Sequence, residues 1–159
     1  MNPADLRNEL GKPYEFYTTT EAVEHARLLD GLEGHGDIGF SVTPRDPSAD
    51  RWRVVVCARD QQGILSILAG LFTAFGVDVE RADVFTVNAT FGKTEDRSPR
   101  RRRPRIRGNR GNTDRPTALD IFDVAISDAD RDPPWPEIER DLRSYARKLA
   151  DGSVDEVRE

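Results

Sequence analysis

Hydrophobic residues recur along this chain with two different periods, and these periods predict an order of strands and helices. Ile38, Phe40 and Val42 alternate with other residues over 37–43, which is typical of a strand. A turn-rich connector over 44–50 then leads into a Val-rich run at 52–58. This run predicts a second strand that forms a hairpin with the first and is covered on both sides or buried at an interface.

Residues 64–149 continue the pattern with two helices and two more strands. Residues 64–75 carry a broad apolar stripe at helical spacing, and Gly76 predicts the end of that helix. A strand over 77–85, with a bulge near Glu80 and Arg81, is expected to pair with a strand over 119–126. In the last helix, apolar residues recur at intervals of three and four: Ile138, Leu142, Tyr145 and Leu149.

The order strand, strand, helix, strand, strand, helix predicts an α/β (α+β) fold of the ferredoxin-like plait type. We expect an antiparallel sheet with both long helices on one face. The last strand of such a plait is missing from the sequence pattern. The strand over 36–43, a partner chain or a lost C-terminal region are the candidates for the edge that this leaves open.

Two helices are expected before the sheet. Asn2 and Pro3 mark the start of a short helix that reaches about Leu10 and is optional to the fold, whereas Thr18 and Glu21 have the spacing of a capping box for a helix that ends near Gly31. We therefore interpret residues 1–35 as an N-terminal helical appendage and 36–152 as the main domain. Residues 153–159 are a charged tail.

Charge is distributed unevenly along the 159 residues. The stretch from Lys93 to Arg115 holds ten Lys and Arg against three Asp and Glu, so it carries +7 while the whole chain carries −5. Low hydrophobicity and high charge predict that 89–116 is a disordered basic insertion in a hairpin. An acidic body with one basic segment indicates either self-association through opposite charges or a separate anionic partner.

A ligand site is predicted at the corner between the 52–58 strand and the helix that follows it. The start of a helix presents free backbone N–H groups and a partial positive charge, which suit a carboxylate. Asp60, just before this helix, is placed to accept an ammonium group, so the two together fit a zwitterion. The alternative, equally open at this point, is that Asp60 only caps the helix.

Three segments carry a resemblance to the ACT domains, which are small amino-acid-sensing regulatory modules. The corner resembles the family's aspartate, two residues, glycine and leucine-rich helix, in the form Arg59-Asp-Gln-Gln-Gly-Ile-Leu-Ser-Ile-Leu-Ala-Gly. Residues 75–86 are similar to the family's second strand. Residues 117–124 resemble the third, particularly in the C-terminal ACT domains of bacterial protein-PII uridylyltransferases, and 17–29 resemble the segment that precedes those domains.

The resemblance implies a regulatory rather than a catalytic role. ACT domains pair side by side or within longer chains, and an amino acid binds where the corner meets a neighbouring domain. The implied partners are therefore an amino acid and a second copy or a linked domain, in a protein that senses nitrogen or amino-acid status for an enzyme. The residues that match the binding loop are Asp60, Gln61, Gln62, Gly63, Ile64 and Leu65.

Two further interpretations stay open. The first is nucleic-acid binding through the basic insertion, with phosphate contacts from Arg100, Arg101, Arg102, Arg103, Arg105 and Arg107. We favour it less, because the expected strands lack the paired aromatic residues of an RNA-binding sheet and a solvated loop without a partner explains the same composition. The second is a purely structural dimerisation domain.

No catalytic pattern competes with this interpretation. Asp120 and Asp123 are three apart on a strand and point to opposite faces, and His25 and His35 are interpreted as surface or packing residues. The single cysteine, Cys57, lies in the Val-rich strand, and we interpret it as a small buried hydrophobic residue. We expect no enzyme activity, cofactor or metal. A polar N-terminus and the lack of an apolar run that would span a bilayer favour the cytoplasm.

Overall fold

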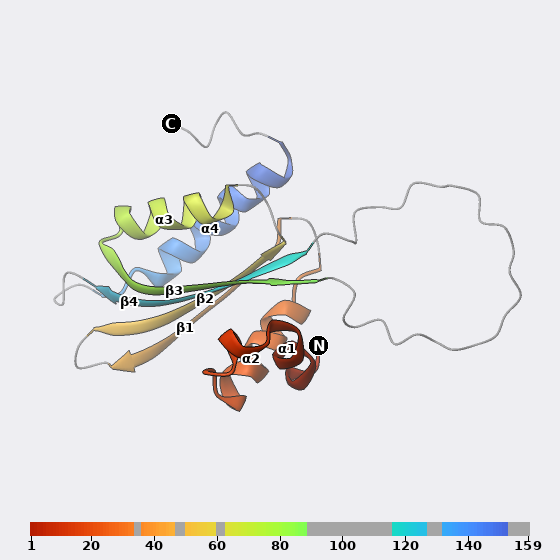
Figure 1. The fold of residues 1–159 in the computed structure, drawn as a ribbon. Helices are drawn as coiled ribbons and strands as arrows, with labels where there is room; N and C mark the ends of the chain where they lie inside the picture. The colour runs from red at the N-terminus through yellow and green to blue at the C-terminus, as the bar shows by residue number, and fades with distance from the viewer. Residues whose placement is uncertain (34–35, 47–49, 60–62, 89–115, 127–131, 153–159) are drawn as a thin grey trace, which may run out of the picture.

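The computed structural model describes residues 1–33, 36–46, 50–59, 63–88, 116–126 and 132–152, and the account below is confined to them. The elements follow one another along the chain in the order shown in Figure 1. They are α1 (Pro3–Leu10), the 3-10 helix η1 (Lys12–Tyr14), α2 (Thr19–Asp30), β1 (Ile38–Asp46), β2 (Arg51–Arg59), α3 (Ile64–Ala74), β3 (Val77–Val87), β4 (Thr117–Ile126) and α4 (Trp135–Ala150).

Four antiparallel strands form one sheet in the order β1-β2-β4-β3. This confirms both predicted pairings, β1 with β2 and β3 with β4. The register of β3 against β4 shifts between Val79 and Arg81, where the bulge was expected. β1 lies beside β2, so the strand that precedes the core fills the edge that the sequence left open.

β1 is longer than predicted. It runs to Asp46, whereas the sequence indicated a turn-rich connector from Pro44 onwards. Pro44 pairs with Trp52, and the register then shifts between Pro44 and Asp46. A proline lacks the N–H that a central strand needs, but β1 is an edge strand and has a neighbour on one side only, so the proline is tolerated there.

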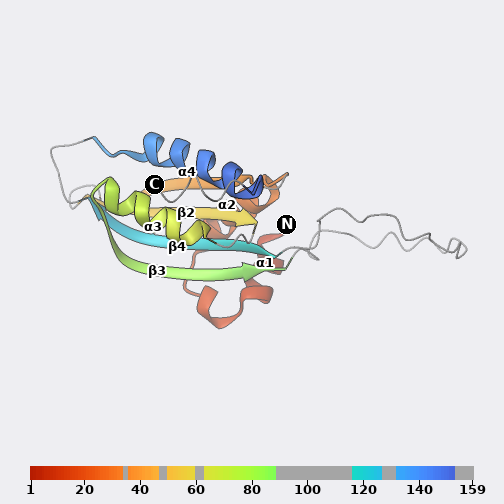
Figure 2. The same cartoon turned by 90° about the horizontal axis from the view of Figure 1, so that it is seen from above.

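Helices α3 and α4 cover the same face of the sheet, as predicted (Figures 1 and 2). Side chains of both helices share one buried apolar cluster with alternate residues of the strands, among them Val54 and Val56 of β2. The residue between them, Val55, belongs to a second cluster on the opposite face. β2 is therefore a central strand buried on both sides, which explains its unbroken run of valines.

The N-terminal helices lie on the second face of the sheet and make it the middle of three layers (Figure 1). Their contribution to this second cluster includes Leu6 of α1, which is fully buried, and Ala22 and Ala26 of α2. The local signals that predicted both helices are present: Asn2 caps α1, and Thr18 and Glu21 form the capping box of α2. Within the part of the chain described here, no helix combines the length and apolar character that a bilayer crossing requires.

Candidate functional site

The corner between β2 and α3 depends on a glycine. Gly63 is the N-cap of α3 and has φ 100° and ψ −14°, a backbone conformation that residues with a Cβ rarely adopt. A Cβ placed there would meet nothing within 4 Å, so the conformation and not crowding favours glycine. Because Gly63 has no side chain, the first turn of α3 has no side-chain cap from this residue.

Of the predicted ligand-binding residues, the structure describes Gly63, Ile64 and Leu65. Ile64 is buried in the core under α3, whereas Leu65 is 45% exposed. Asp60, Gln61 and Gln62 lie outside the described residues, so their roles stay predictions. The same holds for the predicted basic contacts Arg100, Arg101, Arg102, Arg103, Arg105 and Arg107, and for most of the 89–116 insertion.

The corner lies at the end of the sheet where β3 ends and β4 begins. Arg59, the last residue of β2, pairs with Thr117 of β4, and Thr117 in turn pairs with Val87 of β3. Beyond Val87, the backbone N–H of Asn88 donates a 2.6 Å hydrogen bond to Glu9 of α1. The start of α3 and the two attachment points of the basic segment therefore share one end of the sheet.

An exposed apolar strip runs along β3, the edge strand opposite β1. Val79 and Val84 are 47% and 56% exposed, although they lie on the face that α3 and α4 cover elsewhere. Leu65 is exposed on α3, the helix that packs against β3. We call these three residues the β3 edge surface. An edge strand with exposed apolar side chains is a template for pairing with another chain.

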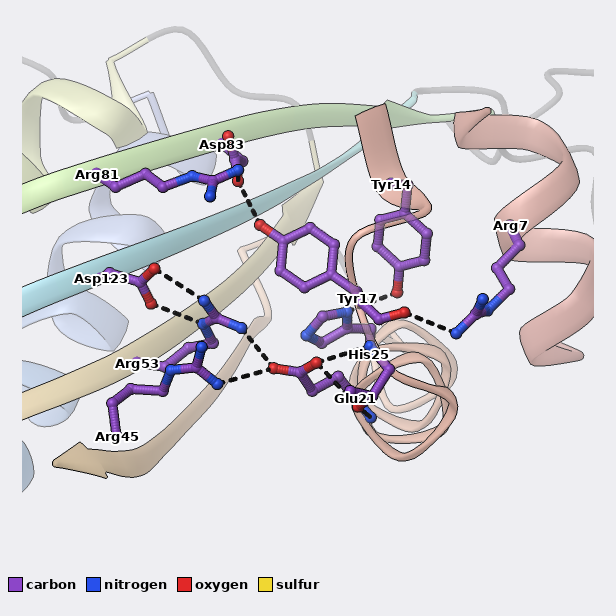
Figure 3. A network of polar contacts seen from close by, with 11 residues as sticks. Arg7, Tyr14, Tyr17, Glu21, His25, Arg45, Arg53, Arg81, Asp83 and Asp123 are labelled. Carbon is purple, nitrogen blue, oxygen red and sulfur yellow. Dashed lines mark hydrogen bonds and ion pairs between the residues drawn. The ribbon is translucent and has the colours of Figure 1, made fainter. Parts of the chain in front are cut away.

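A network of polar contacts, which the sequence analysis missed, joins α2 to the second face of the sheet (Figure 3). Its centre is Arg53, a mostly buried arginine in the Val-rich strand β2. The Arg53 guanidinium donates to both carboxylate oxygens of Asp123 on β4, at 2.7 and 2.8 Å, and to Glu21 of α2. Its carbon Cζ lies 5.2 Å from the centre of the Tyr17 ring.

The charges in this network stabilise one another. Burial acts to lower the pKa of Arg53, but the bonds to Asp123 and Glu21 outweigh it and keep that pKa above its usual value. For Glu21, burial acts to raise the pKa, and hydrogen bonds from Thr18 and Arg53 hold it below its usual value instead. Both groups are therefore charged at neutral pH, as a buried ion pair requires.

Tyr14 and His25 form a buried, hydrogen-bonded pair beside the Arg53 network. The Tyr14 hydroxyl and Nδ1 of His25 share a 2.6 Å hydrogen bond, and both side chains are almost fully buried. Burial lowers the pKa of His25 to about 4, with the nearby Arg53 acting in the same direction and Glu21 and Glu24 opposing it. His25 is thus a packing residue, the second of the two predicted possibilities, and it is neutral at pH 7.

The remaining residues with possible chemistry do not gather into a reactive site. Asp120 pairs with Val56 of β2 and lies on the face toward α3. Asp123 faces Arg53 and α2, so the two carboxylates are on opposite faces as predicted. Cys57 is fully buried, and burial raises the pKa of its thiol. Among the described residues, no three His, Cys, Asp or Glu side chains lie close enough together to hold a metal ion.

A signal for the network does exist in the sequence. Arg53 is the one charged residue between Trp52 and Ala58, and a charge inside a buried strand requires a partner. What the sequence does not reveal is that Asp123 lies directly opposite it in the sheet. No family model matches the chain, and a search of curated proteins finds no match either.

Proposed function

We propose that this chain is an ACT-like regulatory domain that binds a small amino acid at the start of α3. It associates with a second copy or a linked domain, and it signals nitrogen or amino-acid status to an enzyme outside this chain. The observation that carries the proposal is Gly63, the N-cap of α3: it has a positive φ, and it has no side chain that could cap the first amide groups of the helix.

The arrangement of the sheet supports the same proposal. The order β1-β2-β4-β3, with α3 and α4 on one face, is compatible with a ferredoxin-like plait in which β1 stands where the last strand of the plait would lie. In an ACT-like plait the ligand loop follows the first core strand, which is β2 here. The resemblance of residues 59–70 to the family's binding loop falls at that place.

Calorimetric titration of the full chain against the twenty amino acids tests the binding site. Gly63→Ala forces a Cβ onto a positive φ, which costs about 1–2 kcal/mol and displaces the first turn of α3. Gly70→Ala is the matched control, because Gly70 lies in the same helix with open space around it and without a positive φ. We expect Gly63→Ala to weaken binding by at least about tenfold, or ~1.4 kcal/mol, while Gly70→Ala leaves the affinity unchanged.

Two results would contradict the binding site. One is the absence of heat with every amino acid, which favours the purely structural dimerisation role. The other is equal affinity of the Gly63→Ala and Gly70→Ala variants.

Sedimentation tests the association. The β3 edge surface contains Val84, which is 56% exposed, so Val84→Lys changes this edge without disturbing the core. We expect the wild-type chain to sediment as a dimer and Val84→Lys as a monomer with an unchanged melting temperature. A wild-type chain that is monomeric at every concentration would contradict a binding site shared between two copies of the chain.

A further inference from the structure

Several polar contacts join residues 1–30, which we call the N-terminal layer, to one another. The N-terminal ammonium group pairs with Asp30 at the far end of α2, and Arg7 donates to the Tyr17 carbonyl at 2.7 Å. The Tyr14–His25 hydrogen bond and the capping box of α2 are also internal to the layer. Because these contacts need nothing from the sheet, they stay intact when the layer separates from it.

Two of the polar contacts that cross from this layer to the sheet join charges that keep a second partner. Glu21 bonds to Arg53, but Glu21 also accepts from Thr18, and Arg53 also bonds to Asp123 of the neighbouring strand. On β3, Asp83 accepts from Tyr17 of the layer, and the same carboxylate pairs with Arg81 at 2.8 Å. Separation of the layer from the sheet therefore leaves none of these charges without a partner. The other crossing contacts, Ser41 to Glu24, Arg45 to Glu21 and Asn88 to Glu9, join exposed or half-buried groups that water reaches once the layer separates, so the cost is mainly apolar exposure.

The hydrophobic contacts of the layer are also separate from those of α3 and α4. Its buried side chains belong to a cluster with Val55, Cys57, Leu119 and Ile121 of the sheet, while α3 and α4 belong to the cluster on the other face. Figure 1 shows the sheet lying between the two. Stability in proteins is divided among cooperative units of this kind, which open with different free energies.

We propose that the N-terminal layer opens from the sheet as one unit while the sheet, α3 and α4 remain folded. The layer thus acts as a cover, and the opened form presents an apolar face of β2 and β4 centred on Cys57. This opening is independent of the proposed amino-acid site at the start of α3, on the other face of the sheet.

The chain carries one natural probe for each face. Cys57 is its single cysteine and is fully buried under the layer. Its two tryptophans, Trp52 and Trp135, pack together on the opposite face, with ring centroids 5.8 Å apart. Thiol labelling therefore reports opening of the layer, and tryptophan fluorescence reports unfolding of the α3–α4 side.

The test measures the labelling rate of Cys57 by a thiol reagent in the wild-type chain and in matched variants without denaturant. Leu142→Ala removes a fully buried side chain from the α3–α4 cluster, and Tyr17→Phe removes the bond to Asp83 from the layer. We expect Leu142→Ala to lower the urea midpoint of fluorescence without changing the labelling rate, and Tyr17→Phe to accelerate labelling about fivefold.

Labelling that needs global unfolding would behave differently. It would accelerate about a hundredfold or more in Leu142→Ala, in proportion to the stability lost, and this result overturns the proposal. A labelling rate that Tyr17→Phe leaves unchanged overturns it too. If Leu142→Ala does not fold, Ile138→Val takes its place, with an unchanged rate expected and an acceleration of about fivefold as the contradicting result.

Discussion

Protonation of His25 makes the stability of this fold depend on pH in a calculable way. The ring is buried and has a pKa of about 4 in the folded chain, against the ordinary value of 6.5. As the pH falls below 6.5, the unfolded chain takes up a proton at His25 and the folded chain does not. The free energy of unfolding therefore falls with decreasing pH, and the full stability returns above pH 6.5.

The magnitude follows from the two pKa values. At pH 5.0 the unfolded chain is almost fully protonated at His25, whereas the folded chain is protonated to about a tenth. Between pH 7.5 and pH 5.0 the wild-type chain should lose about 2 kcal/mol of unfolding free energy through this residue. Glu21, whose pKa is lowered below 4.5, contributes in the same direction but at more acidic pH, so this window isolates the histidine.

Urea unfolding at the two pH values measures the difference. His25→Asn keeps a hydrogen-bonding group near Nδ1 but does not titrate, so its unfolding free energy should change by less than about 0.5 kcal/mol over the same window. The matched control is Thr20→Ala, a substitution of an exposed residue that does not titrate in the same helix, which should keep the wild-type dependence. A His25→Asn variant with the same pH dependence as the wild type would refute the reasoning.

Two further substitutions test individual contacts. Arg53→Met leaves Glu21 and Asp123 facing each other without the guanidinium and should lower the unfolding free energy by about 3 kcal/mol; a loss below 1 kcal/mol in urea unfolding would show that the network adds little. Thr18→Ala removes the capping box and should cost about 1 kcal/mol, whereas Thr20→Ala, at an exposed position in the same helix, should cost less than half as much; equal melting temperatures would contradict the cap's role.

Local features of the fold could be predicted because a few neighbouring residues determine them. Asn2 and Thr18 cap their helices as expected, and the helix over 64–75 ends before Gly76, which has φ 70°. The bulge beside Glu80 was visible as a change in the alternation of apolar residues. In each case the relevant contacts lie within a few positions along the chain.

Long-range features could not be predicted in the same way. Three candidates for the open edge of the sheet were equally compatible with the sequence, and only the pairing of β1 with β2 selects among them. The bond between Arg53 and Asp123 joins residues 70 positions apart, and no local pattern links them. At the candidate site, the start of a helix just after Gly63 was predicted, but the positive φ of Gly63 was not, and Asp60, the side chain most needed for an ammonium group, lies outside the described residues.

The most direct test of the central claim is a titration of the isotopically labelled chain with amino acids, followed by the backbone amide signals in two-dimensional NMR. If the start of α3 holds the carboxylate of an amino acid, the largest shifts should fall on the amides of Gly63, Ile64 and Leu65, and one amino acid should produce them at submillimolar concentration. Shifts confined to other parts of the chain, or none with any of the twenty, would contradict it.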